Sequence, residues 1–388
     1  MARDFDIVVL GLGGIGSGAA YWLARRGKNS VLGLEQFELG HVRGESQDHS
    51  RIIRLSYHAP HYVRLAKRAY ESWATLETES NTRVVLKTGG LDLGPRAGAI
   101  PLSGYADAMA ACGVDFERVD AAEIMRRWPQ FTLSDDIEGL FQAESGIAMA
   151  ARANDTHRRM ARANGAVLRD NAPVERIVDR DGEIEVRAGG TTYRCGKLII
   201  AAGPWTNRAL ANFGVHIPLE ITKEQVTYFA APDAASFAPD RFPVWIWMDD
   251  PSFYGFPVFG EAGPKVAQDA GGKAVDPDTR TFEPDPENFA RVERFLQRYL
   301  PSALGPVIYT KTCLYTLTPD RDFVIDLVPG HPNISFAIGA GHAFKFASVI
   351  GRILGELVCD GGTRSEIGAF SAGREILAMA DPPKSYMV

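Results

Sequence analysis

Two short runs of apolar residues stand near the N-terminus, with a helical pattern between them. The first run covers residues 7–10, and the second covers residues 31–34 and ends in Glu35. Between them, small and apolar residues recur at helical spacing, at Ala19, Ala20, Leu23 and Ala24. Unbroken apolar runs of this length are typical of strands buried on both faces. The pattern therefore predicts a βαβ unit.

Periodic patterns predict further elements. Residues 61–79 place a set of apolar side chains on one helical face: Tyr62, Leu65, Ala69, Trp73 and Leu76. Residues 104–114 and 121–129 are also expected to be helical, and Pro129 should end the second helix. Residues 88–95 are expected to form a strand that enters a new region.

Residues 166–207 alternate apolar and polar positions, which is typical of an antiparallel ribbon. A turn is expected at Asp181-Gly182, and a buried strand at residues 198–202. Near the C-terminus, residues 333–357 predict a strand, a glycine loop and an amphipathic helix.

Residues 216–309 are rich in expected strands and contain one expected helix near residues 287–300. The pattern of the first unit therefore recurs at the start, middle and end of the chain. This predicts two interleaved domains, one made of residues 1–87, 146–215 and 310–388, and the other of residues 88–145 and 216–309.

The first apolar run leads into the glycine-rich sequence GLGGIG. In a βαβ unit, Gly11 permits a tight turn, Gly13 lets the backbone approach a pyrophosphate, and Gly16 lets the helix pack on the strand. Glu35 follows Gly16 by 19 residues, where a carboxylate can bind ribose hydroxyls. The alternative is an incidental glycine loop, and the motif does not separate NAD from FAD. The predicted dinucleotide contacts are Gly11, Gly13, Gly14, Ile15, Gly16, Glu35 and Gln36.

Composition narrows the possible classes of protein. The chain has 388 residues with 45% hydrophobic and 23% charged residues, as expected for a globular protein of about two domains. A net charge of −6 argues against nucleic-acid binding. No apolar run reaches membrane-spanning length and no signal peptide is recognisable, so a cytoplasmic location without membrane contact is expected. The four cysteines and eight histidines show no metal-ligand spacing, and we expect no metal site.

Two further segments favour FAD over NAD. Gly339 and Gly341 precede the last expected helix, whose N-terminal end can stabilise negative charge on a reduced flavin. The alternative is a terminal helix with an ordinary cap. The segment LIIAAGPW resembles a strand found in FAD proteins. The further predicted cofactor contacts are Val174, Ala202, Gly203, Trp205, Gly339, Gly341, His342 and Lys345.

Four segments, SRIIRLSY, YGFPVFG, KTCLYTLTPDRDFVIDLVPGH and GAGHAFKFAS, closely resemble the monomeric sarcosine oxidase family, which includes N-methyltryptophan oxidase. The resemblance runs nearly end to end. It implies an α/β fold in which a Rossmann-type FAD-binding domain is interleaved with an α+β catalytic domain built on a mixed sheet. It further implies a monomer that oxidises a secondary amine carrying a carboxylate, with O₂ as electron acceptor and H₂O₂ as product.

The resemblance also implies roles for single residues. Arg54 and Lys345 match the family's carboxylate-binding pair, where an arginine offers a bidentate fork and a lysine a point charge. Lys265 matches the lysine that activates O₂, and a cation there would stabilise superoxide. The positions expected to line the active site are Tyr254, Tyr315 and His342.

Other matches concern the flavin. Arg51 matches an arginine beside the flavin ring, with Ser50 as a hydroxyl partner. Cys313 matches the cysteine whose thioether holds the flavin 8α-methyl group, so FAD is expected to be covalently bound through Cys313. Lys311 could favour the thiolate that this attachment needs.

The chain departs from the family in places that affect the substrate. GESQDHSR replaces a GSHHGDTR-like segment, so that His49 stands for an aspartate, and Asp269 stands for a histidine. Trp245 and Trp247 are expected near the pocket mouth, where they would suit a larger or cyclic secondary amino acid. Two alternatives remain: an FAD-dependent dehydrogenase of an amino or hydroxy acid with a non-oxygen acceptor, and a nucleotide-binding protein without redox chemistry.

Overall fold

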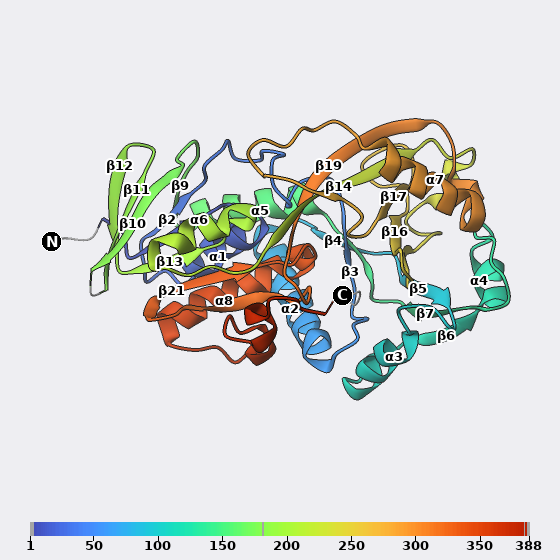
Figure 1. Cartoon of the computed structure of the whole chain (residues 1–388), viewed down its shortest axis with the longest axis horizontal. Coiled ribbons are helices and arrows are strands. Elements are labelled where there is room, and N and C mark those ends of the chain that lie inside the picture. The colour runs from blue at the N-terminus through green and yellow to red at the C-terminus, as the bar shows by residue number, and fades with distance from the viewer. Residues whose placement is uncertain (1–3, 181, 384, 386–388) are drawn as a thin grey trace.

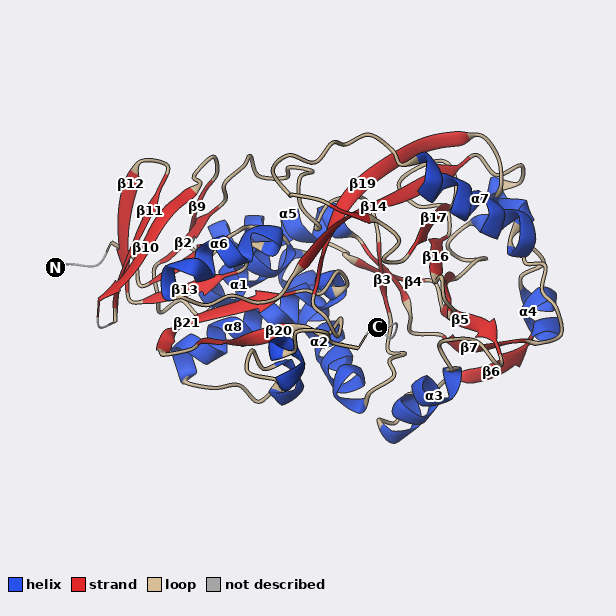
Figure 2. Ribbon diagram, in the orientation of Figure 1, coloured by secondary structure: helices blue, strands red, loops and turns tan. Residues whose placement is uncertain are grey.

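The structure is a computed structural model that describes residues 4–180, 182–383 and 385. Two large sheets lie at opposite ends of an elongated molecule (Figures 1 and 2). The chain crosses between them several times, because strands of each sheet come from distant parts of the sequence. The fold is thus of the mixed α/β class that the sequence predicts.

The first sheet contains the predicted βαβ unit. Its order is β20 (Val324–Val328), β21 (His331–Ile338), β13 (Lys197–Ile200), β1 (Ile7–Leu10), β2 (Val31–Leu34) and β9 (Val167–Arg169). All neighbours are parallel except β20 and β21. The sheet is therefore a Rossmann-type sheet with one antiparallel edge strand.

Both faces of this sheet are covered, which explains the unbroken apolar runs. Ile7 and Val9 pack against the helices, while Val8 and Leu10 pack against the core on the opposite face. The helices are α1 (Gly14–Arg25), α2 (Pro60–Ser80), α5 (Ala150–Ala163) and α8 (Ala347–Asp360). On the other face lie α6 (Thr206–Leu210) and the ribbon β10 (Val174–Arg180), β11 (Glu183–Ala188) and β12 (Thr191–Cys195). In the predicted turn, Gly182 has φ of +88°, and Asp181 lies outside the described residues.

The second large sheet is mixed, as expected for the catalytic domain. Its order is β18 (Lys273–Ala274), β14 (Glu220–Phe229), β17 (Lys265–Gln268), β16 (Phe253–Phe256), β15 (Val244–Trp247), β5 (Gly90–Pro95), β7 (Ile137–Gln142) and β6 (Glu117–Asp120). Only the β15–β5 pair is parallel among these described strands. The helices α3 (Leu102–Ala111), α4 (Ala121–Arg127) and α7 (Pro286–Tyr299) lie at this end of the molecule (Figure 1).

A long strand, β19 (Val307–Leu317), pairs with β14 over almost its whole length. The predicted domain boundary at residue 310 therefore falls within a strand of the large mixed sheet. A small sheet of β3 (Arg51–Ile53), β8 (Gly146–Ala148) and β4 (Val85–Lys87) lies between the two large sheets. The division into two interleaved domains remains our proposal, with β19 best grouped with the mixed sheet.

The remaining helical turns are short 3-10 segments: η1 (Gly203–Trp205), η2 (Ala211–Phe213), η3 (Ala234–Phe237), η4 (Pro301–Ala303), η5 (Ala343–Phe346), η6 (Gly368–Phe370) and η7 (Glu375–Ala378). The helix expected to open near Gly341 is preceded by η5, so α8 itself begins at Ala347. No helix in the described part of the chain is both long and apolar enough to span a membrane.

Candidate active site

The glycine loop between β1 and α1 accepts only glycine at two positions. Gly11 has φ of +83°, and a Cβ there would lie 2.4 Å from the Ala201 carbonyl oxygen. A Cβ at Gly16 would lie 1.8 Å from the Gly11 carbonyl oxygen. The loop is therefore wrapped tightly against the start of α1, which leaves the N-terminus of that helix open toward a ligand.

Glu35 at the end of β2 fixes this loop. Its Oε2 accepts a hydrogen bond from the Leu12 backbone N–H at 2.8 Å, and its Oε1 lies 3.4 Å from His41 Nε2. Burial alone would raise the pKa of Glu35, but hydrogen bonds from His41 and Leu12 lower it below its ordinary value. The carboxylate is thus ionised and held by the loop, while its contact with a ribose, like that of Gln36, which follows it directly, stays a prediction.

A cavity that is partly open to solvent runs from the start of α1 into the space between the two large sheets. Its walls come from widely separated segments of the chain. Ten predicted site residues line it: Gly14, Ile15, Arg51, Arg54, Tyr254, Tyr315, Gly339, Gly341, His342 and Lys345. The structure therefore brings the predicted cofactor loop and the predicted substrate residues to one cavity.

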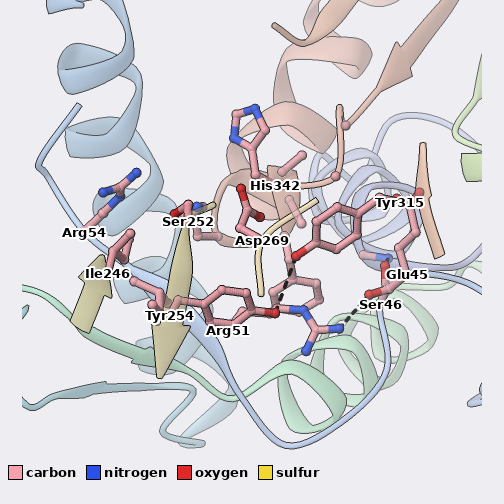
Figure 3. Close-up of a pocket in the computed structure, with 18 of the residues that line it drawn as sticks. Glu45, Ser46, Arg51, Arg54, Ile246, Ser252, Tyr254, Asp269, Tyr315 and His342 are labelled. Carbon is pink, nitrogen blue, oxygen red and sulfur yellow. Dashed lines mark hydrogen bonds between the residues drawn. The ribbon is translucent and has the colours of Figure 1, made fainter. Parts of the chain in front are cut away.

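Arg51 lines this cavity close to Glu45 and Ser46 (Figure 3). Its Nη1 donates to the Ser50 carbonyl oxygen and its Nη2 to the Glu45 carbonyl oxygen, each at 2.8 Å. Burial raises the pKa of Glu45 to about 7, although its hydrogen bond from Thr316 opposes this rise. The two hydrogen bonds to backbone oxygens fix the guanidinium of Arg51, which stays charged next to the cavity.

Arg54 and Lys345 supply positive charge to the opposite end. Arg54 is 4% exposed, and its Nη1 lies 3.2 Å from Asp92 Oδ1. Burial and the neighbouring charge of Arg54 lower the pKa of Lys345 to about 7. Two buried cations, only one of them paired with a described carboxylate, make this end of the cavity suited to bind an anion.

The wall between these two ends is aromatic and polar. The hydroxyl groups of Tyr254 and Tyr315 lie 3.5 Å apart, and Gly341 is packed so closely on Tyr315 that a Cβ there would lie 2.7 Å from its ring. His342 Nε2 lies 2.8 Å from the Arg321 carbonyl oxygen, while its Nδ1 is buried without a described partner. Asp269, which lines the same cavity, pairs with Arg321 Nη1 at 2.9 Å.

Lys265 is buried behind this wall on β17. Its Nζ donates to Asp48 Oδ2 at 3.0 Å and to the Ser50 carbonyl oxygen at 2.9 Å, and it lies 4.1 Å from the ring centroid of Phe256, a cavity residue. The Ser50 hydroxyl is buried with no described hydrogen-bond partner. Lys265 therefore sits close to the predicted flavin region, but as part of an ion pair.

Cys313 occupies a buried position on β19, opposite Glu224 of β14. Burial raises the pKa of its thiol to about 11, and the charge of Arg51 opposes this rise. Arg51 thus favours the thiolate, and the contribution expected from Lys311, whose charge also interacts with Cys313, stays a prediction.

The other predicted cofactor residues lie after β13 and at the start of the ribbon that packs on the first sheet. Gly203 has φ of +53° and opens η1, directly after Ala202. Trp205 Nε1 donates to Asp278 at 2.7 Å, and Val174 begins β10. Their role in cofactor binding remains a prediction.

The expectation for Trp245 and Trp247 is wrong. Both side chains point away from the cavity, into the core beneath α7, where they contact the ring of Phe295 at centroid distances of 5.5 and 5.4 Å. Strand residues alternate between faces, so Ile246 faces the cavity instead. The argument for a bulky substrate from tryptophan walls therefore fails, and the aromatic lining comes from Tyr105, Tyr254, Phe256, Tyr315 and Phe344.

Several cavity or neighbouring residues were not predicted from the sequence. Ser46 Oγ accepts a hydrogen bond from the Gly14 N–H at 2.9 Å at the start of α1, and Asp48 holds Lys265. Both come from the GESQDHSR segment, whose departure from the family pattern was the available signal. Others carried no local signal, namely Tyr105, Met248 and Ser252.

The described residues fit FAD. The N-terminal end of α1 reaches the cavity through Gly14 and Ile15, a fixed arginine stands beside it, and the buried Ser50 hydroxyl lacks a partner. No group of three or more potential metal ligands occurs among the described residues.

Comparisons with known proteins agree with this geometry. Residues 6–357 match the family described as FAD dependent oxidoreductase. The chain is 33% identical over 382 residues to monomeric sarcosine oxidase of Bacillus sp. (strain NS-129), covering 97% of this chain and 98% of that protein. It is 30% identical over 355 residues to N-methyl-L-tryptophan oxidase of Salmonella heidelberg, covering 90% and 93%.

Among solved structures, NikD, described as an unusual amino acid oxidase essential for nikkomycin biosynthesis, is 26% identical and superposes with a TM-score of 0.84 over 100% of this chain and 99% of that chain. An L-proline dehydrogenase from P. horikoshii shares the fold at 22% identity with a TM-score of 0.84, covering 96% of this chain and 97% of that chain. Fold and site together define a flavin-dependent oxidoreductase. The chain belongs to the FAD-dependent oxidoreductase family that includes monomeric sarcosine oxidase and N-methyl-L-tryptophan oxidase.

Proposed function

We propose that this protein oxidises the secondary amine of an N-methyl or cyclic amino acid to an imine and passes the electrons to O₂, giving H₂O₂. The observation that carries the proposal is the joint placement of Arg54 and Lys345 in the cavity that the FAD-binding loop reaches through Gly14 and Ile15. The relatives named above, which are oxidases of N-methyl amino acids by name, support the same substrate class.

The cation pair would orient the substrate. A carboxylate bound between Arg54 and Lys345 directs the amine and its α-carbon toward the middle of the cavity, where Tyr254 and Tyr315 lie. Bound FAD supplies the two-electron acceptor for the C–H bond that breaks. The amine gives up one proton as the C=N bond forms, and the imine is then hydrolysed by water.

Asp269 lines the same cavity, which is partly open to solvent, and the proton that the amine gives up passes to solvent. The ion pair of Asp269 with Arg321 places a carboxylate in the cavity wall, in addition to the cation pair that binds the substrate carboxylate. This arrangement complements an amino acid, which carries both signs of charge.

We further propose that FAD is covalently bound through Cys313. Burial of Cys313 and the nearby Arg51 charge support a cysteine held close to the cofactor region. A tethered flavin cannot dissociate. A monomeric state and a cytoplasmic location remain predictions.

A second candidate is a dehydrogenase of an amino or hydroxy acid that passes electrons to an acceptor other than O₂. The observation that favours it is that Arg54 and Lys345, which line the same cavity, would bind the carboxylate of a hydroxy acid as well as that of an amino acid.

One set of measurements tests both candidates. The purified yellow protein is mixed without air with N-methyl amino acids, proline, pipecolate and a hydroxy acid, and bleaching of the flavin band identifies substrates. The reduced protein is then mixed with O₂ or with a quinone dye. Bleaching by a secondary amine and rapid return with H₂O₂ formation are expected. Bleaching by the hydroxy acid alone, or return with the dye alone, would favour the second candidate.

A further inference from the structure

The GESQDHSR segment places a carboxylate where an ordinary side chain is strained. Asp48 has φ of +81°, a backbone conformation that favours glycine and that aspartate and asparagine tolerate better than most residues. Its side chain is 3% exposed. A buried carboxylate in a left-handed backbone conformation has two costs, so the contacts that it makes must compensate for them.

Those contacts converge on Lys265. Asp48 Oδ2 accepts from Lys265 Nζ at 3.0 Å, and the two carboxylate oxygens lie 3.0 and 3.1 Å from the Tyr228 hydroxyl, which donates to them. The Lys265 side chain is 1% exposed. The Ser50 carbonyl oxygen accepts a second hydrogen bond from Nζ, so two of its three N–H donors are held by fixed oxygens.

We infer that Asp48 is a positioning residue for the reaction with O₂: it holds Lys265 protonated and fixed behind the cavity wall, so that the ammonium can stabilise negative charge on O₂ as electrons arrive. This inference rests on the proposed function, because it assigns a task to Lys265 that only an oxidase needs. Electron transfer to O₂ creates charge in a buried site, and a fixed cation there acts without reorganisation.

Without Asp48, the surroundings would favour a neutral lysine. Burial lowers the pKa of Lys265 to about 8, and Arg51 acts in the same direction, whereas Asp48 raises it. Arg51 Nη1 also lies 3.9 Å from Asp48 Oδ2. The other titratable groups near the ion pair are His49, Tyr228, Glu261, Lys311 and Cys313. Asp48 is the one ionised carboxylate among the described residues that hydrogen-bonds Lys265. Its loss should lower the pKa of Lys265 further.

The test compares the two half-reactions in Asp48→Asn, Asp48→Gly and Lys265→Met. Asparagine keeps the shape of the aspartate side chain and tolerates the positive φ at position 48, and glycine removes the backbone strain there. At least one of the two variants should therefore fold with flavin bound. The rate constant for reduction of the flavin by substrate without air should stay within about twofold of the parent's. Reoxidation by O₂ at pH 7.5 should fall by a factor on the order of 10², toward the rate of Lys265→Met.

The pH profile separates this role from a merely structural one. In the parent, the rate constant for reoxidation should fall as pH rises through about 8, since Lys265 then loses its proton. In Asp48→Asn, that fall should move to lower pH, so that slow reoxidation at pH 7.5 recovers at pH 6. The matched control is Asp326→Asn on β20, a partly buried carboxylate that accepts from the Ser371 hydroxyl at 2.9 Å, and it should leave the profile unchanged.

A stability measurement gives a second readout. Lys265→Met leaves the buried Asp48 with only the more distant cation of Arg51, at 3.9 Å, and should lower the thermal midpoint. Adding Asp48→Asn to that variant should restore part of the loss. If Lys265→Met is reoxidised slowly but Asp48→Asn is reoxidised at the normal rate with an unshifted pH profile, the inference about Asp48 is wrong while the proposed function stands. Faster reoxidation in Asp48→Asn would overturn it as well. Normal reoxidation in Lys265→Met would instead remove the oxidase role of Lys265 in the proposed function.

Discussion

Arg54 and Lys345 lie over the same aromatic ring. The guanidinium carbon of Arg54 is 4.9 Å from the ring centroid of Tyr57, and Lys345 Nζ is 5.8 Å from it. Tyr57 is fully buried, so its electron-rich face offsets part of the cost of placing two cations in a buried site. The arrangement keeps two like charges together in the cavity, and a substrate carboxylate would neutralise part of that charge.

The first prediction concerns the planar guanidinium group of Arg54. Arg54→Lys keeps the charge beside Asp92 but removes the planar pair of donors, so substrate binding should weaken by about 1.5–3 kcal/mol. This corresponds to a rise in the dissociation constant of roughly 10- to 100-fold, measured by anaerobic titration of the flavin spectrum. Arg352→Lys is the control, because Arg352 pairs with Glu356 on α8. Equal binding by Arg54→Lys and the control would contradict the role of Arg54.

The second prediction concerns pH and Lys345. Its pKa is lowered to about 7, so it carries its charge below pH 7 and loses it above. Binding of a carboxylate inhibitor without an amino group should therefore weaken as pH rises from 6 to 9. Lys345→Gln should flatten this dependence. The pKa of Glu45 is also raised to about 7, and its ionisation would weaken anion binding in the same range. Glu45→Gln should keep most of the pH dependence of inhibitor binding. Loss of that dependence in Glu45→Gln would mean that Glu45 is the group that titrates.

Local patterns predicted much of this fold because their causes are local. The glycine loop and α2 follow from residues that are neighbours in sequence, and both were confirmed. The orientation of β15 was not predictable in the same way. The period of two shows that Trp245 and Ile246 face opposite sides, but which side is the cavity depends on α7, some 40 residues later.

The ion pair in the candidate site shows the same limit. Asp48 and Lys265 are 217 positions apart in the chain, and neither segment alone indicates that they meet. The departure of GESQDHSR from the family pattern indicated that this segment is unusual. Only the packing of β17 against that segment gives the Asp48 carboxylate its partner. Long-range electrostatic partners are thus the part of the site that sequence reasoning missed.

The third prediction concerns flavin attachment. After precipitation in acid, the flavin of the parent should remain with the protein pellet, whereas Cys313→Ala should release it to the supernatant. Because burial raises the pKa of Cys313 to about 11, the thiolate is scarce at neutral pH. Covalent incorporation of FAD into apoprotein should therefore speed up by up to about tenfold per pH unit between pH 7 and 9. Flavin in the supernatant of the parent would exclude the attachment.

The last prediction concerns the two faces of β15. Ile246 lines the cavity, so Ile246→Ala should enlarge it and shift kcat/KM toward bulkier N-substituted amino acids by about tenfold or more. Trp245 is 1% exposed and stacks on Phe295 at an interplanar angle of 14°. Trp245→Ala should cost about 3–5 kcal/mol of unfolding free energy and leave the substrate preference unchanged. The two variants separate pocket shape from core packing, since they alter adjacent residues of one strand. A change of preference in the folded fraction of Trp245→Ala, with none in Ile246→Ala, would mean that the substrate approaches β15 from the α7 side.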